Sequence, residues 1–129
     1  PALVQAHSGD PYSLPQDFLP FADGFGEVTL ILGHLGWGHD GAMERQVHAI
    51  QHSRHGNVYT DTSSSRSIVP GLIEWAVREV GADRMLYGTD SPLYFAPMQR
   101  ARIDQAEMPV EAKRLVLRGN AERLLRVTE

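Results

Sequence analysis

Four short apolar runs constrain the fold of this 129-residue chain more than any other feature, because each ends in polar residues and precedes a stretch with helical spacing. The runs are ALVQAHSGD at 2–10, EVTLILGHLG at 27–36, NVYTDTSSS at 57–65 and DRMLYGTDSP at 83–92. Strands that alternate with helices are typical of a parallel α/β sheet. The sequence therefore predicts an α/β fold in a single domain over residues 1–129.

Helical segments are expected between and after these runs. They are predicted at residues 15–25, about 38–53, about 69–80, about 97–107 and 110–127. Pro15 suits the first position of a helix, and Gly81 suits the residue that ends one. No low-complexity linker separates the four units, so we see no internal domain boundary.

Composition narrows the range of partners. The 12 basic and 16 acidic residues give a net charge of -4 with no basic patch, which favours neither nucleic acid nor an anionic membrane surface. The absence of cysteine excludes disulfides and thiolate metal sites. No apolar run is long enough to span a membrane, and residues 1–20 lack a signal-peptide pattern. We therefore expect a soluble cytoplasmic protein that acts on a small molecule.

Polar side chains follow each predicted strand where parallel α/β folds carry their chemistry. The ends of the four runs provide His7, Ser8 and Asp10; His34; Asp61, Thr62 and Ser63; and Thr89, Asp90 and Ser91. Two histidines and an aspartate from different strands are suitable for a zinc-like divalent ion. A carboxylate there can also take a proton from metal-bound water.

Several of these residues have an ordinary structural alternative. Asp90 could cap the helix that follows, and capping is at least as good an interpretation as pocket lining for Asp61 and Ser63. Trp37 lies between glycines and could stack on a substrate, although core packing is as good an interpretation.

Three further histidines are expected to share one helix face. His48, His52 and His55 are spaced i, i+4 and i+7, but HAIQH lacks the glutamate that follows the first histidine in zinc metalloprotease helices. We expect a solvated or helix-packing face here. His39 and Asp40 are weaker candidates for the pocket rim.

The strand-end segments resemble those of the amidohydrolase superfamily, within it the metal-dependent hydrolases and decarboxylases with TIM-barrel folds. QAHSGD is similar to the strand-five segment, with His7 as metal ligand, and LILGHLG to strand six, with His34. NVYTDTS is similar to strand seven, and MLYGTDSP to strand eight, with Asp90. GNAERLL at 119–125 is similar to the Gly-Asn-Ala signature near the end of the family's sequences.

The resemblance implies the C-terminal half of a (β/α)8 barrel, strands five to eight. The His-x-His pair that strand one supplies in the family does not occur in this sequence. We therefore expect the chain to pair with a separate N-terminal half or with another copy of itself. In that pairing, Leu30 and Leu32 are among the residues expected to line the barrel interior.

The resemblance also implies a reaction. We expect a divalent ion, zinc, held by His7 and Asp90, with Asp90 transferring a proton and His34 acting on the substrate. Trp37, Asp61, Ser63 and Ser91 are the expected substrate-binding residues. The expected reaction is hydrolysis of an amide, ester or lactone in a small carboxylated or ring substrate. The alternatives are non-oxidative decarboxylation of an aromatic or enoic acid, and a non-catalytic α/β scaffold or binding module.

Overall fold

The computed structural model describes residues 2–126 and contains one four-stranded sheet. The strands are β1 (Leu3–Ala6), β2 (Thr29–Leu32), β3 (Val58–Asp61) and β4 (Met85–Leu86). They pair in chain order, and every pair is parallel. The structure confirms the predicted α/β fold with four parallel strands.

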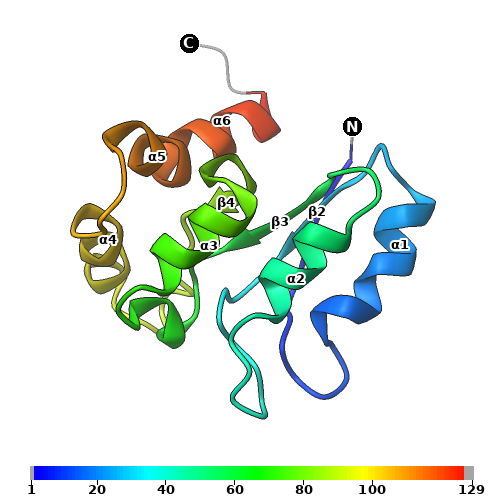
Figure 1. Cartoon of the computed structure of the whole chain (residues 1–129), viewed down its shortest axis with the longest axis horizontal. Coiled ribbons are helices and arrows are strands. Elements are labelled where there is room, and N and C mark those ends of the chain that lie inside the picture. The colour runs from blue at the N-terminus through cyan, green and yellow to red at the C-terminus, as the bar shows by residue number, and fades with distance from the viewer. Residues whose placement is uncertain (1, 127–129) are drawn as a thin grey trace.

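Helices follow each strand (Figure 1). The α-helices are α1 (Leu19–Gly24), α2 (Arg45–His52), α3 (Leu72–Val80), α4 (Ala96–Asp104), α5 (Val110–Arg114) and α6 (Asn120–Leu125). Shorter helical turns are η1 (Pro15–Phe18), η2 (Ser65–Ile68) and η3 (Ala82–Arg84), and the π-helical η4 (Leu115–Gly119) joins α5 to α6. None of the helices in residues 2–126 is long and apolar enough to cross a membrane.

One face of the sheet packs against helices. Leu30, Leu32 and Val58 form a buried cluster with Ala22 of α1 and with α2. The prediction that Leu30 and Leu32 line the barrel interior is wrong, because both side chains cluster with the helices. Because side chains alternate along a strand, these two leucines point to the helices and not to the opposite face.

The opposite face carries the alternate residues. Gln5 and Ile31 are in register, as are Ile31 and Tyr59, so the three side chains share this face. Asp61, two residues after Tyr59, also belongs to it, and Gln5 Nε2 donates a hydrogen bond of 3.0 Å to Asp61 Oδ2. This face leads to the strand ends that carry the candidate site.

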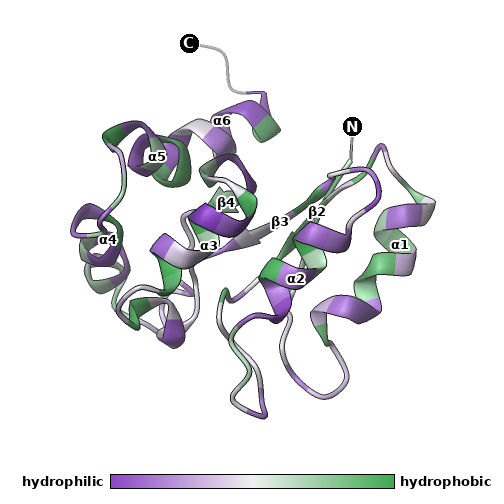
Figure 2. Cartoon of the chain, viewed as in Figure 1, coloured by the Kyte–Doolittle hydropathy of each residue, from purple (hydrophilic) through white to green (hydrophobic). Residues whose placement is uncertain are grey.

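A second buried cluster surrounds α3. It comprises Leu35, Val47, Leu72, Ile73, Ala76, Met85, Ile103 and Val116. Hydrophobic and hydrophilic residues both occur along α2 and α3 in Figure 2, as expected of helices that bury one side only. The cluster joins β4 to the C-terminal helices.

Helix boundaries differ from the predictions at several places. The helix predicted at about 38–53 begins only at Arg45, because residues 38–41 form a turn closed by the hydrogen bond from Gly41 N to Gly38 O and residues 42–44 have no regular structure. The helix predicted from Val69 begins at Leu72 and ends at Val80, and Gly81, whose φ is 87°, follows it as the C-cap. The last predicted helix ends at Leu125, and Val127 lies outside the described residues.

Candidate active site

The ends of β1, β2 and β4 bring three predicted site residues together. His7 follows β1, His34 follows β2, and Asp90 lies in the loop after β4. All three line each of two cavities, one of about 140 Å³ and one of about 440 Å³. The structure therefore places them around a common space, as the strand-end argument predicts.

The two cavities differ in the rest of their lining. The smaller cavity is also lined by Asp10, Trp37, Ser64, Leu93 and Tyr94. The larger cavity is also lined by Gln5, Ala6, Gly33, Asp61, Ser63, Gly88 and Thr89. The smaller one thus has aromatic and aliphatic walls, whereas the larger one lies over the polar end of the sheet.

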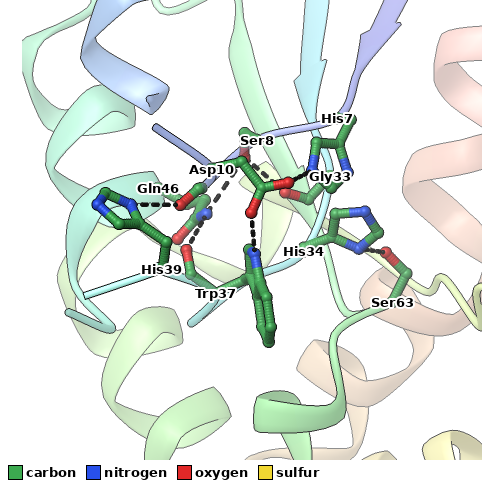
Figure 3. Close-up of polar contacts among 10 residues, drawn as sticks. His7, Ser8, Asp10, Gly33, His34, Trp37, His39, Gln46 and Ser63 are labelled. Carbon is green, nitrogen blue, oxygen red and sulfur yellow. Dashed lines mark hydrogen bonds and ion pairs between the residues drawn. The ribbon is translucent and has the colours of Figure 1, made fainter. Parts of the chain in front are cut away.

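Asp10 connects the first strand end to Trp37 (Figure 3). His7 Nε2 lies 2.7 Å from Asp10 Oδ2, and Trp37 Nε1 donates to Asp10 Oδ1 over 3.1 Å. The hydrogen bonds from Trp37 and His7 lower the pKa of Asp10 below its ordinary value. An ionised carboxylate only accepts hydrogen bonds, so His7 donates through Nε2, and in the neutral ring Nδ1 carries the free lone pair.

Buried polar groups hold the loop after β1 in place. Ser8 Oγ donates to Gly33 O over 2.6 Å, and Gln46 Nε2 donates to Trp37 O over 3.0 Å. Gly9 has a φ of 112°, and a Cβ there would lie 2.4 Å from Trp37 O. Only glycine fits this close approach between the loops after β1 and β2.

His34 has an unusual backbone conformation. Its φ of 73° lies in the left-handed region, which costs free energy for a residue with a side chain. Its backbone N donates to Asp61 Oδ1 over 3.1 Å, and its ring Nδ1 lies 2.7 Å from Ser63 Oγ. Neighbouring polar groups therefore hold both the backbone and the ring.

Asp61 and Ser63 do not cap the next helical turn. Ser64 has that role, since its hydroxyl accepts from Arg66 N. Asp61 is buried, at 3% exposed, and accepts from Ser63 N and Ser63 Oγ. The proposed role of these residues in substrate binding stays a prediction, and the structure shows their polar atoms bonded to protein groups.

Asp90 does not cap a helix either. Helix α4 begins after Phe95, five residues further along the chain, and has no side-chain cap. Asp90 has a φ of 53°, and its carbonyl accepts from Leu93 N over 2.9 Å. Within residues 2–126, no hydrogen bond to the Asp90 carboxylate is found. That carboxylate is therefore available to a ligand of the cavity.

The donor types around the cavities fit a divalent ion in part. A neutral imidazole nitrogen of His7 and the Asp90 carboxylate are ligands that such ions accept. In the described part of the chain, no group of three or more histidine or carboxylate side chains is placed to hold a metal. These residues therefore offer an incomplete ligand set that further groups have to complete.

Other predicted candidates lie elsewhere. Ser91 is exposed and lines neither cavity. His39 is exposed, and Asp40 pairs with Arg45. His48 and His52 line a different groove, the outer groove, between α2 and the η1–α1 segment, with Gln16 and Leu19 among its other walls. His55 lies beyond the end of α2 and does not share their helix face.

Sequence reasoning missed part of the site. It did not identify Leu93 and Tyr94, which line the smaller cavity, and it named Asp10 at a strand end without its role of holding His7. The signal for Asp10 was its position three residues after His7 at a strand end. No sequence pattern marked Leu93 and Tyr94, because their place in the cavity wall depends on the course of the loop after β4, which only the tertiary structure shows.

Comparison with known proteins agrees with this geometry. The family model described as Amidohydrolase matches residues 3–127, and the chain therefore belongs to this amidohydrolase family. No curated protein matches the chain in sequence. Membership confirms the resemblance based on the strand-end segments.

Solved structures confirm the fold. An uncharacterised TIM-barrel protein from Bordetella bronchiseptica matches with a TM-score of 0.76 and 23% identity over 96% of this chain and 45% of that one. The 2,6-dihydroxybenzoate decarboxylase from Rhizobium matches with a TM-score of 0.63 and 22% identity over 81% and 36%. A dihydroxybenzoic acid decarboxylase from Polaromonas was solved with manganese and an inhibitor. It matches with a TM-score of 0.64 and 21% identity over 84% of this chain and 36% of that one.

These matches also define how much of a barrel the chain forms. The chain spans between 36% and 45% of the length of these three structures. Its four parallel strands and outer helices therefore correspond to part of a TIM barrel, as predicted. The prediction that a separate half or a second copy completes the barrel stays a prediction.

Proposed function

We propose that this chain contributes to a metal-dependent decarboxylase of a small aromatic acid. The observation that carries the proposal is the smaller cavity, where His7, His34 and Asp90 meet the walls formed by Trp37 and Tyr94. Histidine and carboxylate groups suit a metal ion and proton transfer, and aromatic walls suit the face of a planar ring.

The known relatives support this chemistry over hydrolysis. The matched enzymes from Rhizobium and Polaromonas are decarboxylases of dihydroxybenzoic acids. The Polaromonas structure holds manganese, so manganese has to be tested beside the zinc expected from sequence. Both observations concern relatives. That this chain shares their decarboxylation and their metal is part of the proposal.

His7 and Asp90 are the residues proposed to hold the ion. A bound divalent ion would orient the substrate carboxylate and neutralise its charge. Trp37 would lie against the ring, its indole fixed by Asp10. The remaining ligands would come from the rest of the barrel.

His34 is proposed to supply the proton. In decarboxylation the bond between the ring carbon and the carboxylate carbon breaks, carbon dioxide leaves, and a proton takes its place on the ring carbon. His34 lines both cavities and is fixed at its Nδ1 side by Ser63, which leaves Nε2 for this transfer. Nε2 would first take up a proton from solvent and then pass it to the ring carbon. Asp90 would accept or return a proton at its carboxylate oxygens.

Hydrolysis is the second candidate. The observation that favours it is the Asp90 carboxylate, which has no hydrogen-bond partner in residues 2–126 and is free to act as a base toward water. The family's own description, Amidohydrolase, agrees with it.

The test is turnover by the purified protein that contains this chain, loaded with manganese or zinc. We expect release of carbon dioxide from 2,6-dihydroxybenzoate, and little release in the His34→Asn variant. His52→Gln, on the outer groove, is the matched control and should retain activity. Cleavage of ester or lactone substrates without carbon dioxide release would replace the proposal with hydrolysis. No metal binding and no turnover would favour a scaffold.

A further inference from the structure

We propose that Asp61 and Ser63 are positioning residues that hold His34 as its Nδ1–H tautomer, with Nε2 as the atom that exchanges the proton. The consequence of this inference for catalysis rests on the role proposed for His34. Its structural content, a defined tautomer, can be measured without any turnover.

The direction of two hydrogen bonds determines the tautomer. The Ser63 hydroxyl has one hydrogen, and it donates this hydrogen to Asp61 Oδ1. Ser63 Oγ therefore presents a lone pair to His34 Nδ1, which lies 2.7 Å away. The hydrogen of that contact has to belong to His34 Nδ1, which leaves Nε2 unprotonated in the neutral ring.

Asp61 is held as an acceptor by groups that only donate to it. Gln5 Nε2 lies 3.0 Å from Oδ2, and the backbone N atoms of Ser63 and His34 lie 2.9 and 3.1 Å from Oδ1. Each of these three amide N–H groups can only donate, so each requires a lone pair of the Asp61 carboxylate. An ionised Asp61 cannot donate to Ser63, so the Ser63 hydroxyl has a single direction.

The same carboxylate oxygen fixes the backbone of His34. Asp61 Oδ1 accepts from His34 N, while Leu35 N donates to Asp61 O over 2.8 Å. Both bonds hold the left-handed turn at His34, whose φ is 73°. Left-handed backbone at a residue with a side chain persists only where the surroundings stabilise it, and such residues concentrate at functional sites.

Close packing restricts one side of the pair. A Cβ added at Gly88 would lie 3.0 Å from Asp61 Cγ and 3.1 Å from Ser63 Cβ, so the backbone after β4 lies directly against both side chains. Asp61 is 3% exposed and Ser63 6%. Neither side chain has room to turn toward Gly88.

The consequence is a ring with one defined reactive edge. Figure 3 shows the second ring nitrogen of His34 on the side opposite Ser63. His34 lines both cavities, and so do His7 and Asp90. A fixed tautomer places the basic nitrogen at the cavity before substrate binds, which removes the cost of orienting it during the reaction.

The first test is ¹⁵N NMR of the histidine-labelled full protein without substrate, at about pH 8.5, where an ordinary histidine with a pKa near 6.5 is neutral. The His34 signal is assigned by its absence in His34→Asn. We expect the Nδ1–H tautomer to dominate in the wild type. A dominant Nε2–H tautomer overturns the inference, and this measurement does not depend on any Ser63 variant folding.

The second test compares three variants at neighbouring serines. Ser63→Ala removes the hydroxyl and should raise the Nε2–H share, whereas Ser63→Thr keeps a hydroxyl and should retain the wild-type tautomer. Ser65→Ala, two residues further along in η2, is the control and should change nothing. An unchanged tautomer in Ser63→Ala overturns the inference.

Kinetics then links the tautomer to the reaction. We expect Ser63→Ala to lower kcat about tenfold, which corresponds to the loss of one orienting hydrogen bond, with KM changed by less than about twofold. Ser63→Thr should recover most of kcat. A larger effect on KM than on kcat would contradict a positioning role and return Ser63 to substrate binding. Absence of wild-type turnover refutes the proposed function, while the tautomer is still decided by NMR.

Discussion

His7 and His34 lie edge to face, with ring centroids 4.7 Å apart and ring planes 67° apart. The two residues are 27 positions apart in the sequence and meet because β1 and β2 are adjacent parallel strands. Each ring is held by a different carboxylate, His7 by Asp10 and His34 through Ser63 by Asp61. The site therefore contains two independently oriented imidazoles, and substitutions can test them separately.

Asp90→Asn should abolish turnover and leave the fold intact. The substitution keeps the volume of the side chain but removes its negative charge and its capacity to transfer a proton, which are worth about 10²–10⁴ in rate. The measurement is kcat/KM together with circular dichroism. Asp17→Asn, at an exposed position in η1, is the control. Near-native activity in Asp90→Asn would show that the assignment of Asp90 is wrong.

Asp10→Asn should weaken metal binding about 10–100-fold, the usual effect of removing a partner that orients a metal-binding histidine. An asparagine can still accept from Trp37 with its oxygen, but its NH₂ group then faces His7 Nε2. That arrangement favours a proton on His7 Nδ1 and removes the lone pair proposed for the ion. Calorimetric titration with manganese and zinc measures the change, and unaltered affinity would exclude this role of Asp10.

Gly9→Ala should destabilise the protein by about 1–3 kcal/mol. The added methyl group would lie 2.4 Å from Trp37 O, at a backbone φ of 112° that disfavours any side chain. Gly24→Ala is the matched control, because a Cβ at the end of α1 meets nothing within 4 Å. Urea unfolding of both variants measures the difference. Equal stability of the two would contradict the close approach of these loops.

Glu74→Gln should destabilise the protein in a pH-dependent way. Burial raises the pKa of Glu74, but hydrogen bonds from Arg102 and from Glu107 N outweigh it, and the net pKa lies below the ordinary 4.5. A carboxyl with a lowered pKa stabilises the fold fully above pH 4.5, and this contribution disappears as the pH falls through the folded-state pKa.

The measurement for Glu74 is urea unfolding from pH 7 down to pH 3. The wild type should exceed Glu74→Gln by about 1–3 kcal/mol at neutral pH, and the two should converge in acid. Glu27→Gln, at an exposed position, is the control. A difference that stayed constant down to pH 3 would rule out the charge as its cause.

His48→Gln and His52→Gln should leave activity and metal content nearly unchanged. Both side chains are exposed on α2 and line the outer groove, away from the cavities at the strand ends. Metal analysis of the purified variants measures this. Loss of metal in either variant would revive a metal-binding role for the helix.

The periodicity of the sequence was sufficient to predict the class of fold. Alternating apolar runs and helical segments leave few architectures, and the predicted parallel sheet agrees with the strand pairing. The polar residues at the strand ends were sufficient to predict that His7, His34 and Asp90 meet. Parallel strands bring their carboxyl ends to one edge whatever their other contacts are.

Helix limits and sheet faces required more than local pattern. Residues 38–44 were predicted as helix but form a turn and an irregular segment, in which Asp40 accepts from Ala42 N and pairs with Arg45. The sequence pattern allows Leu30 and Leu32 to point toward either face of the sheet, because alternation does not indicate which face packs against the helices. Packing against α1 and α2 decided it.

What the sequence by itself determined is which residue types stand at the end of each strand, and hence the kind of chemistry that can be gathered there. Only the tertiary structure decided what each group does. Asp61 is buried among donors and directs Ser63 toward His34, whereas Asp90 faces a cavity with its carboxylate free of partners in the described residues. Both are aspartates at strand ends, and their roles differ because hydrogen-bond partners and burial depend on contacts between distant segments.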